Sequence, residues 1–342
     1  MKDGKLFLFL FFIPLFAFSQ NLSQKKDVEF ILILKQPDKM RKEEKLKKKT
    51  AKPLKIFSLE KRPYKITISR NSEYLSLATK EGFLLVYDLK KMELSFEKEI
   101  SHAPLYALDN HPQEEKIVIG DRDGVIEIFN LKEKKIEKTI YELKAPISDI
   151  KFSSDGTVIG VAHFGGRVSF YNPISKELLL EINPHKNSIY SLALDKKFSY
   201  LVTASRDKTV KVFSLEKKKV IQTFKNYKGF VLDCALSDDD MFLATGAGDG
   251  QVIIYKKENK TWEKPYFQWI CGNWVTSLKF FGKYLYTASR DGKVRIFDYK
   301  NKFLLAVIDT EEPIINIDVN KEYIAVASPA SVKIYSNQRI VE

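Results

Sequence analysis

An aromatic residue recurs at a constant interval of 42 residues along most of the chain, and this repeat restricts the possible folds more than any other feature. In each copy the aromatic residue ends a short apolar run and is followed by a polar or turn residue. The six positions are Tyr87, Phe129, Tyr171, Phe213, Tyr255 and Phe297, and Tyr335 follows after a shorter step of 38 residues. Such a period is typical of arrays in which each repeat forms one supersecondary unit that packs on its neighbours.

A second column lies six residues upstream of the aromatic column and carries turn residues. Its members are Glu81-Gly82, Asp123-Gly124, Gly165-Gly166, Asp207-Lys208, Asp249-Gly250 and Asp291-Gly292. Asp-Gly between two apolar runs predicts a β-hairpin, because Gly accepts a positive φ and Asp bonds back to the turn backbone. One further apolar run precedes each hairpin and another follows it, as at residues 189–194 and 219–224. The repeat therefore predicts four strands, which is the content of a propeller blade.

The two ends of the array predict how the ring closes. An open ring would leave two sheet edges unpaired. The last repeat has three strand-like runs, at 314–319, 323–327 and 332–335, before the sequence ends at Glu342. A run of matching type, 54–59, precedes the first repeat at Ile66. We predict an all-β fold, a seven-bladed β-propeller of four-stranded antiparallel blades, in which this N-terminal strand completes the last blade.

These residues resemble the WD40 repeat family over residues 53–338. The best match begins at His185, continues through Thr203 to Asp207, and ends in Val210-Lys211-Val212-Phe213 where the family places Val-x-x-Trp-Asp. The resemblance implies a hydrogen-bonded network of His185, Thr203 and Asp207 inside that blade. The His column reads Tyr227 and Trp269 in the next two repeats, and Tyr or Phe replaces Trp throughout. We therefore expect hydrophobic packing between blades, rather than buried polar networks, to hold the ring together.

The first 52 residues differ in composition from the repeats. Residues 1–19 have a short charged start, an apolar run of 13 residues from Leu6 to Phe18, and the small-x-small sequence Ala17-Phe18-Ser19. This pattern predicts a signal peptide cleaved before Gln20 and a periplasmic or secreted protein, because the run is shorter than the ~20 residues of a membrane-spanning helix. The alternatives are an uncleaved anchor and a buried N-terminal helix. After cleavage no membrane span is expected.

Residues 20–52 form a predicted basic arm or linker. Residues 25–52 carry eleven basic and five acidic side chains, in a chain with 57 Lys and Arg against 44 Asp and Glu. Such a run is typical of a solvated linker, and the alternative is an anchor for an anionic surface.

The residues just before each hairpin turn are candidates for partner binding. In propellers that resemble the WD40 family, this column lies on the face that usually binds partners, which we call the top face. The column reads Lys80, Arg122, Phe164, Arg206, Gly248 and Arg290, and Tyr106, Tyr190, Phe230 and Trp274 lie in or near the preceding loops.

Arg beside Tyr and Trp is a composition that protein interfaces favour, and it indicates a protein partner with an acidic surface. We predict Lys80, Arg122, Phe164, Tyr190, Arg206, Trp274 and Arg290 as partner-binding residues, with the three arginines pointing at one another across the top face. The alternative is that each arginine pairs with its neighbouring Asp123, Asp207 or Asp291.

Motifs for catalysis or metal binding are few. The four His residues have none of the spacings that metal sites often use, and no Gly-rich loop precedes a helix. We therefore expect no metal and no cofactor. Cys234 and Cys271 fall about 16 Å apart when the repeats are aligned, which predicts two separate thiols.

Three classes of function are compatible with this sequence. The first is a non-enzymatic, monomeric interaction platform of the periplasm or cell exterior. A narrower version, which rests on analogy in fold and export, is an accessory or assembly factor for an exported respiratory enzyme such as a nitrate reductase. The alternative is a propeller enzyme, a hydrolase or lyase that uses Asp149, Asp233 and Asp318 in the central channel. Nucleic-acid binding is indicated only by the pI of about 9.3, and predicted export argues against it.

Overall fold

The computed structural model describes residues 51–141, 145–258, 261–262 and 264–341. The predicted signal peptide and nearly all of the predicted basic arm lie outside these residues. All of the described residues belong to one structural unit.

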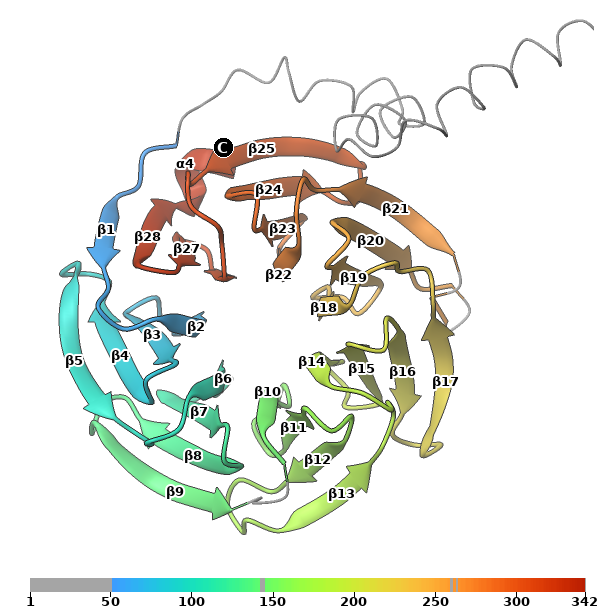
Figure 1. Ribbon diagram of the computed structural model, residues 1–342, viewed down its shortest axis with the longest axis horizontal. Helices are drawn as coiled ribbons and strands as arrows, with labels where there is room; N and C mark the ends of the chain where they lie inside the picture. Colours follow the sequence, from blue (N-terminus) through green and yellow to red (C-terminus); the bar gives the residue numbers. More distant parts are fainter. Residues whose placement is uncertain (1–50, 142–144, 259–260, 263, 342) are drawn as a thin grey trace, which may run out of the picture. The chain divides into compact units, whose positions relative to one another are not determined.

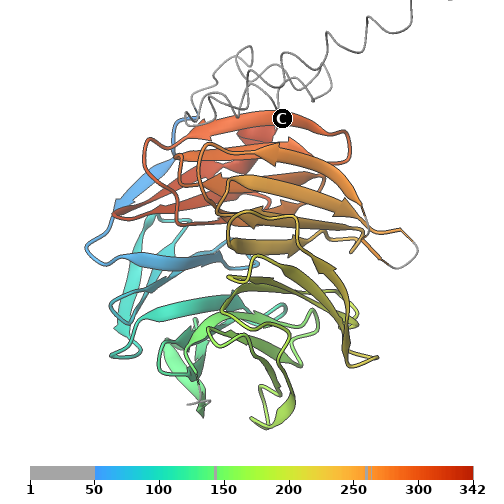
Figure 2. The same ribbon diagram turned by 45° about the vertical axis from the view of Figure 1, so that its right-hand side comes forward.

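Seven antiparallel sheets of four strands each stand around a central axis (Figure 1). Each of the first six blades is made of four consecutive strands, ordered from the channel outward. Figure 2 shows the same sheets side by side from an oblique angle. The prediction of an all-β, seven-bladed propeller is confirmed.

The strands of blades 1 to 4 follow one another without insertions of regular structure. Blade 1 consists of β2 (Pro63–Ile68), β3 (Tyr74–Thr79), β4 (Phe83–Asp88) and β5 (Glu93–Glu99). Blade 2 consists of β6 (Leu105–Asn110), β7 (Lys116–Asp121), β8 (Val125–Asn130) and β9 (Lys135–Tyr141). Blade 3 consists of β10 (Ile147–Phe152), β11 (Ile159–His163), β12 (Val168–Tyr171) and β13 (Leu178–Ile182). Blade 4 consists of β14 (Ile189–Leu194), β15 (Tyr200–Ser205), β16 (Val210–Ser214) and β17 (Lys219–Phe224).

Blades 5 to 7 complete the ring. Blade 5 consists of β18 (Val231–Leu236), β19 (Phe242–Ala247), β20 (Gln251–Lys256) and β21 (Pro265–Ile270). Blade 6 consists of β22 (Val275–Phe281), β23 (Tyr284–Ser289), β24 (Lys293–Asp298) and β25 (Phe303–Asp309). Blade 7 consists of β26 (Asn316–Val319), β27 (Tyr323–Ser328), β28 (Ser331–Ser336) and the N-terminal β1 (Lys55–Ser58). A short helix, α4 (Asn337–Val341), follows β28.

The closure of the ring joins strands from opposite ends of the sequence. Strand β1 pairs antiparallel with β28, with Phe57 opposite Val332, and forms the outer strand of blade 7. In Figure 1 the blue β1 lies beside the red β28. The predicted closure by the N-terminal strand is confirmed.

The turn column forms the hairpins between the second and third strands of the blades. Its second residue has a positive φ in all six repeats, including Lys208 with a φ of 65°. At Gly166 the backbone also comes close to a neighbour, since a Cβ there would lie 2.4 Å from the carbonyl oxygen of His185. Glycine at this position therefore serves both the turn and the packing of the preceding loop.

The aromatic column lies in the core. All seven side chains, Tyr87, Phe129, Tyr171, Phe213, Tyr255, Phe297 and Tyr335, are buried. Tyr87, for example, belongs to an apolar cluster with Ile334 and Val332 of blade 7, and the Phe297 ring packs on Phe267 and Trp269 of blade 5. Burial of such large side chains is a major source of stability.

Buried polar side chains also join the blades, so hydrophobic packing, which we expected to hold the ring together in place of buried polar networks, does so together with them. Near the channel, each of the seven pairs of adjacent blades is linked by a hydrogen bond in which an Asp, Asn or Ser side chain takes part. The bonds are Asn110 Nδ2 to Ile68 O (2.7 Å), Phe152 N to Asp109 Oδ2 (3.0 Å), Leu192 N to Asp149 Oδ2 (3.0 Å), Ser191 Oγ to Asp233 Oδ1 (2.6 Å), Leu278 N to Asp233 Oδ2 (2.7 Å), Asn316 Nδ2 to Ser277 Oγ (3.0 Å) and Ile68 N to Asp318 Oδ2 (2.7 Å). We call these residues the channel clasps. Five of the seven bonds are buried, all except those of Asn110 and Asp109, and losing one partner of a buried bond would leave an unsatisfied polar atom in the core.

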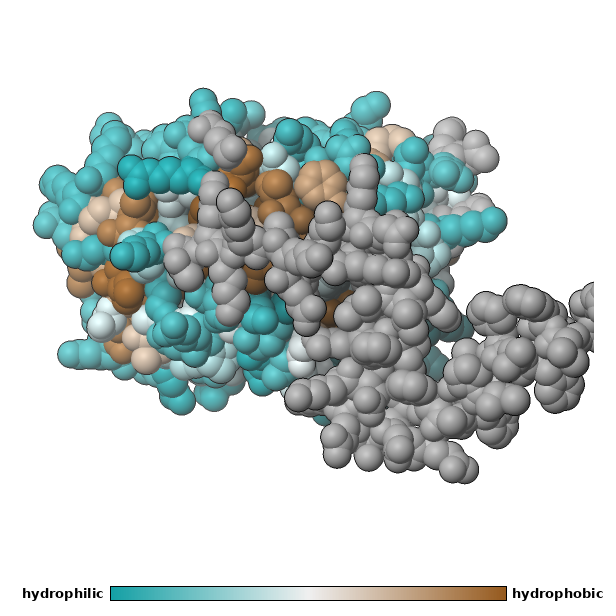
Figure 3. All heavy atoms as spheres, turned by 90° about the horizontal axis from the view of Figure 1, so that it is seen from above, coloured by the Kyte–Doolittle hydropathy of each residue, from teal (hydrophilic) through white to brown (hydrophobic). Residues whose placement is uncertain are grey.

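One side of the ring, seen in Figure 3, is mainly hydrophilic and carries smaller apolar patches.

Both cysteines are buried and neither forms a disulfide, as their spacing predicted. Within the described ranges, no helix has the length and apolar character needed to cross a membrane. The same residues bring no three His, Cys, Asp or Glu side chains together as a metal ion would require.

The buried His163 gives blade 3 a pH-dependent stability. Its Nδ1 lies 3.3 Å from Ala145 O and its Nε2 lies 3.3 Å from Ser169 Oγ. Burial, together with the positive charge of Arg167, lowers the pKa of His163 to about 4. An unfolded histidine has a pKa of about 6.5, so the unfolded chain binds more protons in between, and stability falls as the pH drops from 6.5 toward 4.

We expect His163→Gln to reduce this slope by about 1 kcal/mol per pH unit. The measurement is the free energy of unfolding in urea between pH 7 and pH 4.5. His102→Gln is the matched control, because the His102 side chain is fully exposed. Equal slopes for wild type and His163→Gln would show that His163 titrates normally in the folded protein.

Candidate functional site

A continuous row of aromatic rings lies on the top face. The ring centroids are 4.7 Å apart for Tyr64 and Tyr106, 5.6 Å for Tyr106 and Phe164, 6.4 Å for Phe164 and Tyr190, and 6.5 Å for Tyr190 and Phe230. These five residues come from blades 1 to 5 and are all partly exposed. The row therefore offers a rigid, partly apolar surface that crosses several blades.

A β-bulge explains why three of these rings point out of the sheets. The pairing register shifts near the start of the innermost strands β2, β6 and β14. The residue that the pairing skips is Tyr64 in β2, Tyr106 in β6 and Tyr190 in β14. A bulge leaves its extra residue unpaired and redirects the side chain. Tyr64 was not among the predicted residues, although it lies 42 residues before Tyr106 and the repeat alone would have identified it. Burial raises the pKa of Tyr64 to about 12 and so keeps its hydroxyl protonated.

The three predicted arginines have different surroundings. The Arg122 side chain lies 3.4 Å from the Asp123 carboxylate, so the alternative of a local ion pair holds at this position. The Arg206 guanidinium instead lies 5.3 Å from the centre of the Phe230 ring, and that of Arg290 lies 4.4 Å from the Trp274 ring. Lys80 lies in the same way over Tyr64, at 5.8 Å. Three of the predicted cations therefore stack on aromatic rings of the top face.

The acidic neighbours of Arg206 and Arg290 are engaged elsewhere. Asp207 Oδ2 lies 2.8 Å from His185 Nδ1, and Asp291 Oδ2 lies 2.8 Å from a guanidinium nitrogen of Arg295. Across the described part of the chain, neither Arg206 nor Arg290 forms an ion pair, and both side chains are exposed. Their charges are thus available to a partner.

The network in blade 4 has the geometry that the resemblance implied. His185 Nε2 lies 2.8 Å from the Thr203 hydroxyl, and Thr209, which was not predicted, donates its hydroxyl proton to Asp207 at 2.6 Å. Burial lowers the pKa of His185 even though Asp207 counteracts the shift, so the imidazole is neutral near pH 7. The network fixes the loop that precedes β14 and supports the top face at Tyr190.

Blade 5 has a tyrosine, Tyr227, at the position that His185 occupies in blade 4. The Tyr227 hydroxyl lies 2.8 Å from the Thr245 hydroxyl and 3.2 Å from that of Tyr255. The Asp249 carboxylate accepts hydrogen bonds from the backbone N–H groups of Lys228 and Gly229, at 2.7 and 3.1 Å. A polar network therefore persists in blade 5 although the histidine is absent.

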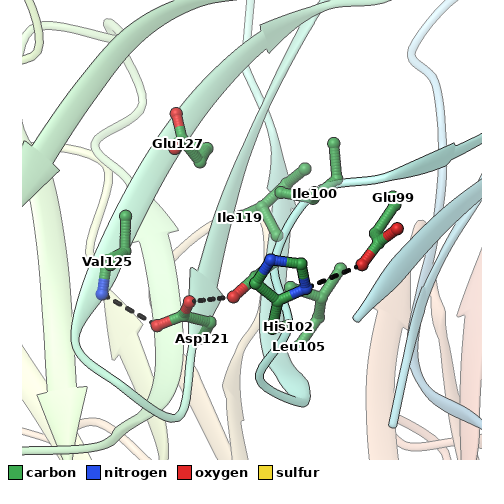
Figure 4. A pocket seen from close by; sticks show the side chains of 9 residues that line it. Glu99, Ile100, His102, Leu105, Ile119, Asp121, Val125 and Glu127 are labelled. Carbon is green, nitrogen blue, oxygen red and sulfur yellow. Dashed lines mark hydrogen bonds and ion pairs between the residues drawn. The ribbon is translucent and has the colours of Figure 1, made fainter. Parts of the chain in front are cut away.

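Blade 2 has Ser101 at the position of His185, and a pocket of about 430 Å³ lies there (Figure 4). Figure 4 shows Glu99 bonded to His102, and Asp121 bonded to the Val125 N–H. Asp121 also accepts a hydrogen bond from the Ser101 hydroxyl at 2.7 Å. Burial raises the pKa of Glu127, the remaining acid of the lining, which accepts the Thr139 hydroxyl at 2.8 Å. Each carboxylate that lines the pocket already has a partner within the chain.

The carboxylates considered for catalysis are parts of the channel clasps. Asp149 lies 3.2 Å from Lys65 of blade 1, and Asp318 lies 2.8 Å from Lys279. Asp233 accepts hydrogen bonds from Ser191 and from the N–H of Leu278. Burial raises the pKa of Asp233, whereas Lys65, Lys151 and the Leu192 N–H together outweigh burial and lower that of Asp149. All three side chains hold blades together.

Comparison with known proteins identifies the repeats. The family model of the WD domain, G-beta repeat, matches residues 176–214, 218–256 and 266–298, which contain most of blades 4, 5 and 6. Actin-interacting protein 1 of Drosophila melanogaster is 31% identical over 103 residues, which are 30% of this chain and 17% of that protein.

Two further relatives have similar coverage. Protein LST8 homolog of Drosophila melanogaster is 24% identical over 33% of this chain and 39% of its own length. Eukaryotic translation initiation factor 3 subunit I of Bos taurus is 29% identical over 26% of this chain and 29% of its own length. The chain thus spans less than two fifths of the length of each of these relatives. Together with the seven-bladed ring, the matches support the WD40 β-propeller family.

Proposed function

We propose that this chain is a WD40-type β-propeller that acts as a non-enzymatic platform for protein interactions and docks an acidic protein surface on its top face. The observation that carries this proposal is the pair of exposed arginines, Arg206 and Arg290. Both are held by stacking on aromatic rings, and their neighbouring carboxylates are engaged elsewhere.

Stacking prepares these arginines for carboxylates. A guanidinium that is held over a ring has lost part of its rotational freedom, so less entropy is lost when it binds. Its planar N–H groups can form two parallel hydrogen bonds with a carboxylate. The adjacent row of Tyr64, Tyr106, Phe164, Tyr190 and Phe230 adds the apolar area that hot spots of protein interfaces contain.

The matched relatives support an interaction role. Actin-interacting protein 1 is named for a protein contact, and translation initiation factor 3 subunit I is named as part of a complex. Their names concern those proteins, and the partner of this chain is a separate matter. We infer only the general role from them.

The place of action is a further part of the proposal. The apolar run Leu6–Phe18 and the sequence Ala17-Phe18-Ser19 support export to the periplasm or the cell exterior. N-terminal sequencing of the natural protein tests this part, because export with cleavage predicts a new N-terminus at Gln20. An intact Met1 would overturn it. The narrower version, an accessory factor for an exported respiratory enzyme such as a nitrate reductase, is tested by the identity of the crosslinked partner.

We expect Arg206→Glu/Arg290→Glu to abolish capture of the dominant crosslinked partner, with a loss of affinity of at least about tenfold, because each change replaces a matching charge by a repelling one. Lys217→Glu/Lys219→Glu makes the same change of charge at the exposed turn between β16 and β17 and should retain the partner. Arg122→Glu should have a smaller effect, since Arg122 is already paired. All variants are first compared in thermal unfolding. Equal capture by wild type and the Arg206/Arg290 variant would overturn the proposal.

A further inference from the structure

The top face has a gap at blade 5. Gly248 occupies the position at which blades 2, 4 and 6 carry Arg122, Arg206 and Arg290. Its φ lies outside the left-handed region, and a Cβ built on it would meet no atom closer than 3.6 Å. Gly250, two residues later, differs in both respects, with a φ of +84° and a Cβ position only 2.4 Å from Cys271 O. Neither the backbone nor the packing requires glycine at residue 248, because a Cβ there would make only ordinary van der Waals contacts. The partly exposed Gly248 backbone therefore lacks the long side chain that other blades carry at this position.

The gap lies between two residues that have aromatic side chains. The Phe230 carbonyl oxygen lies 3.6 Å from the Cβ position of Gly248, and Cε2 of Trp274 lies 3.8 Å from it. Trp274 is 39% exposed, which is high for a tryptophan. The Phe230 backbone and the Trp274 ring thus border the Gly248 backbone.

Each wall carries one of the unpaired arginines. Arg206 stacks on Phe230 and Arg290 stacks on Trp274. Asp249, the nearest acid in sequence, is turned away and accepts the N–H groups of Lys228, Gly229 and Gln251. The gap is therefore bordered by the apolar Trp274 ring and flanked by a cation on both sides, and neither Arg206 nor Arg290 is neutralised within the described residues.

From this geometry we propose that the gap binds one short extended segment of a protein partner, in which an apolar side chain, best an aromatic one, is flanked by acidic residues. The apolar side chain lies on Gly248 between Phe230 and Trp274, and the flanking carboxylates pair with Arg206 and Arg290. This inference rests on the proposed function and names the chemistry of its ligand.

A simpler interpretation of the same face predicts the opposite effect of one substitution. If the arginines act only through their summed positive charge, then Gly248→Arg adds a fourth arginine to the column and strengthens the binding of any acidic ligand. If the gap is the site, the new side chain fills it and weakens binding in spite of the added charge. The substitution is compatible with the fold, because other blades carry arginine at this position and the Cβ has room.

The test uses the full chain and two synthetic peptides with blocked ends, Gly-Asp-Asp-Phe-Asp-Glu-Gly and the same sequence with Ala in place of Phe. Affinities are measured by calorimetry at low ionic strength. We expect wild type to bind the Phe peptide about tenfold more tightly than the Ala peptide, which is the usual range for filling an apolar pocket. Gly248→Arg should weaken the Phe peptide about tenfold or more, and Gly248→Ala, the matched control, should change its affinity less than threefold.

The outcomes separate this inference from the proposed function. Unchanged or tighter binding by Gly248→Arg, equal affinity for the two peptides, or no binding of the Phe peptide by wild type would each overturn the gap as the site. If Arg206→Glu/Arg290→Glu still loses the natural partner in those cases, the top face remains the docking surface. If that variant also retains the partner, both proposals fail. Thermal unfolding of each variant confirms that the propeller is intact.

Discussion

Phe57→Ala is expected to lower the free energy of unfolding by about 3–5 kcal/mol, the usual range for removing a buried phenylalanine. Phe57 is the one buried side chain of β1, and its ring lies 4.2 Å from that of Tyr87 in blade 1. It belongs to a cluster with Ile334 and Val332 of β28. The substitution therefore leaves a cavity at the point where the two ends of the propeller meet.

The substitution has a larger consequence here than at an ordinary core site, because only four residues of β1 pair with β28. Without Phe57 the strand retains mainly backbone pairing, and its detachment would expose the edge of β28. Ile56→Ala is the control, since Ile56 lies in the same strand and is 50% exposed. It should cost less than about 1 kcal/mol. Urea unfolding followed by tryptophan fluorescence measures both changes. Similar costs for the two variants would mean that Phe57 does not secure the closure.

The fold could be predicted because the information for it recurs. Each blade places the same residue types at the same positions, so a hairpin such as Asp291-Gly292 and a buried aromatic such as Phe297 identify one another by spacing. The closing strand at Phe57 could be predicted by counting, since blade 7 lacked one strand.

The channel clasps could not be predicted from the sequence in this way. Asp149 and Asp233 bond to the N–H groups of Leu192 and Leu278, which are backbone groups and therefore leave no mark on the sequence. In the sequence, an acidic residue on an inner strand is the same whether it serves catalysis or holds blades together. Burial and partners, which only the structure supplies, decide between these roles.

The different behaviour of the arginines has a similar cause. Arg122 and Arg206 occupy the same column, yet Arg122 pairs with the carboxylate of its own turn and Arg206 stacks on a ring of the next blade. The choice depends on whether a neighbouring group already binds the turn carboxylate, as His185 binds Asp207. Spacing places the column on the top face, but tertiary contacts determine which of its charges stay available.

The second large effect is expected at the ion pair that links blade 1 with blade 3. Lys65→Met should lower the free energy of unfolding at pH 7 by about 3–5 kcal/mol, because it removes the cation that contacts the buried Asp149 carboxylate. Asp149 is fully buried, and one of its oxygens lies 3.2 Å from Lys65 Nζ. Lys135→Met is the control. The side chains of Lys135 and its partner Glu133 are 61% and 51% exposed, so loss of this pair should leave the free energy of unfolding almost unchanged.

The dependence on pH shows whether charge or packing is responsible. In the wild type, Lys65, Lys151 and the Leu192 N–H outweigh burial and lower the pKa of Asp149, so its contribution to stability is present above about pH 4 and is lost as the pH falls through the lowered pKa. In Lys65→Met burial should dominate and raise this pKa, so protonation relieves the unpaired charge as the pH falls. The difference between wild type and variant should therefore be largest near pH 7 and shrink toward pH 4.

The double variant Lys65→Met/Asp149→Asn completes the test, because it removes both charges of the pair. It should recover much of the stability at pH 7 and lose the pH-dependent difference, since no buried charge is left without a partner. Urea unfolding at pH 7, 5.5 and 4 provides the comparison. A loss in Lys65→Met that is the same at every pH, and that the second substitution does not relieve, would show that the lysine stabilises the ring through the packing of its aliphatic chain.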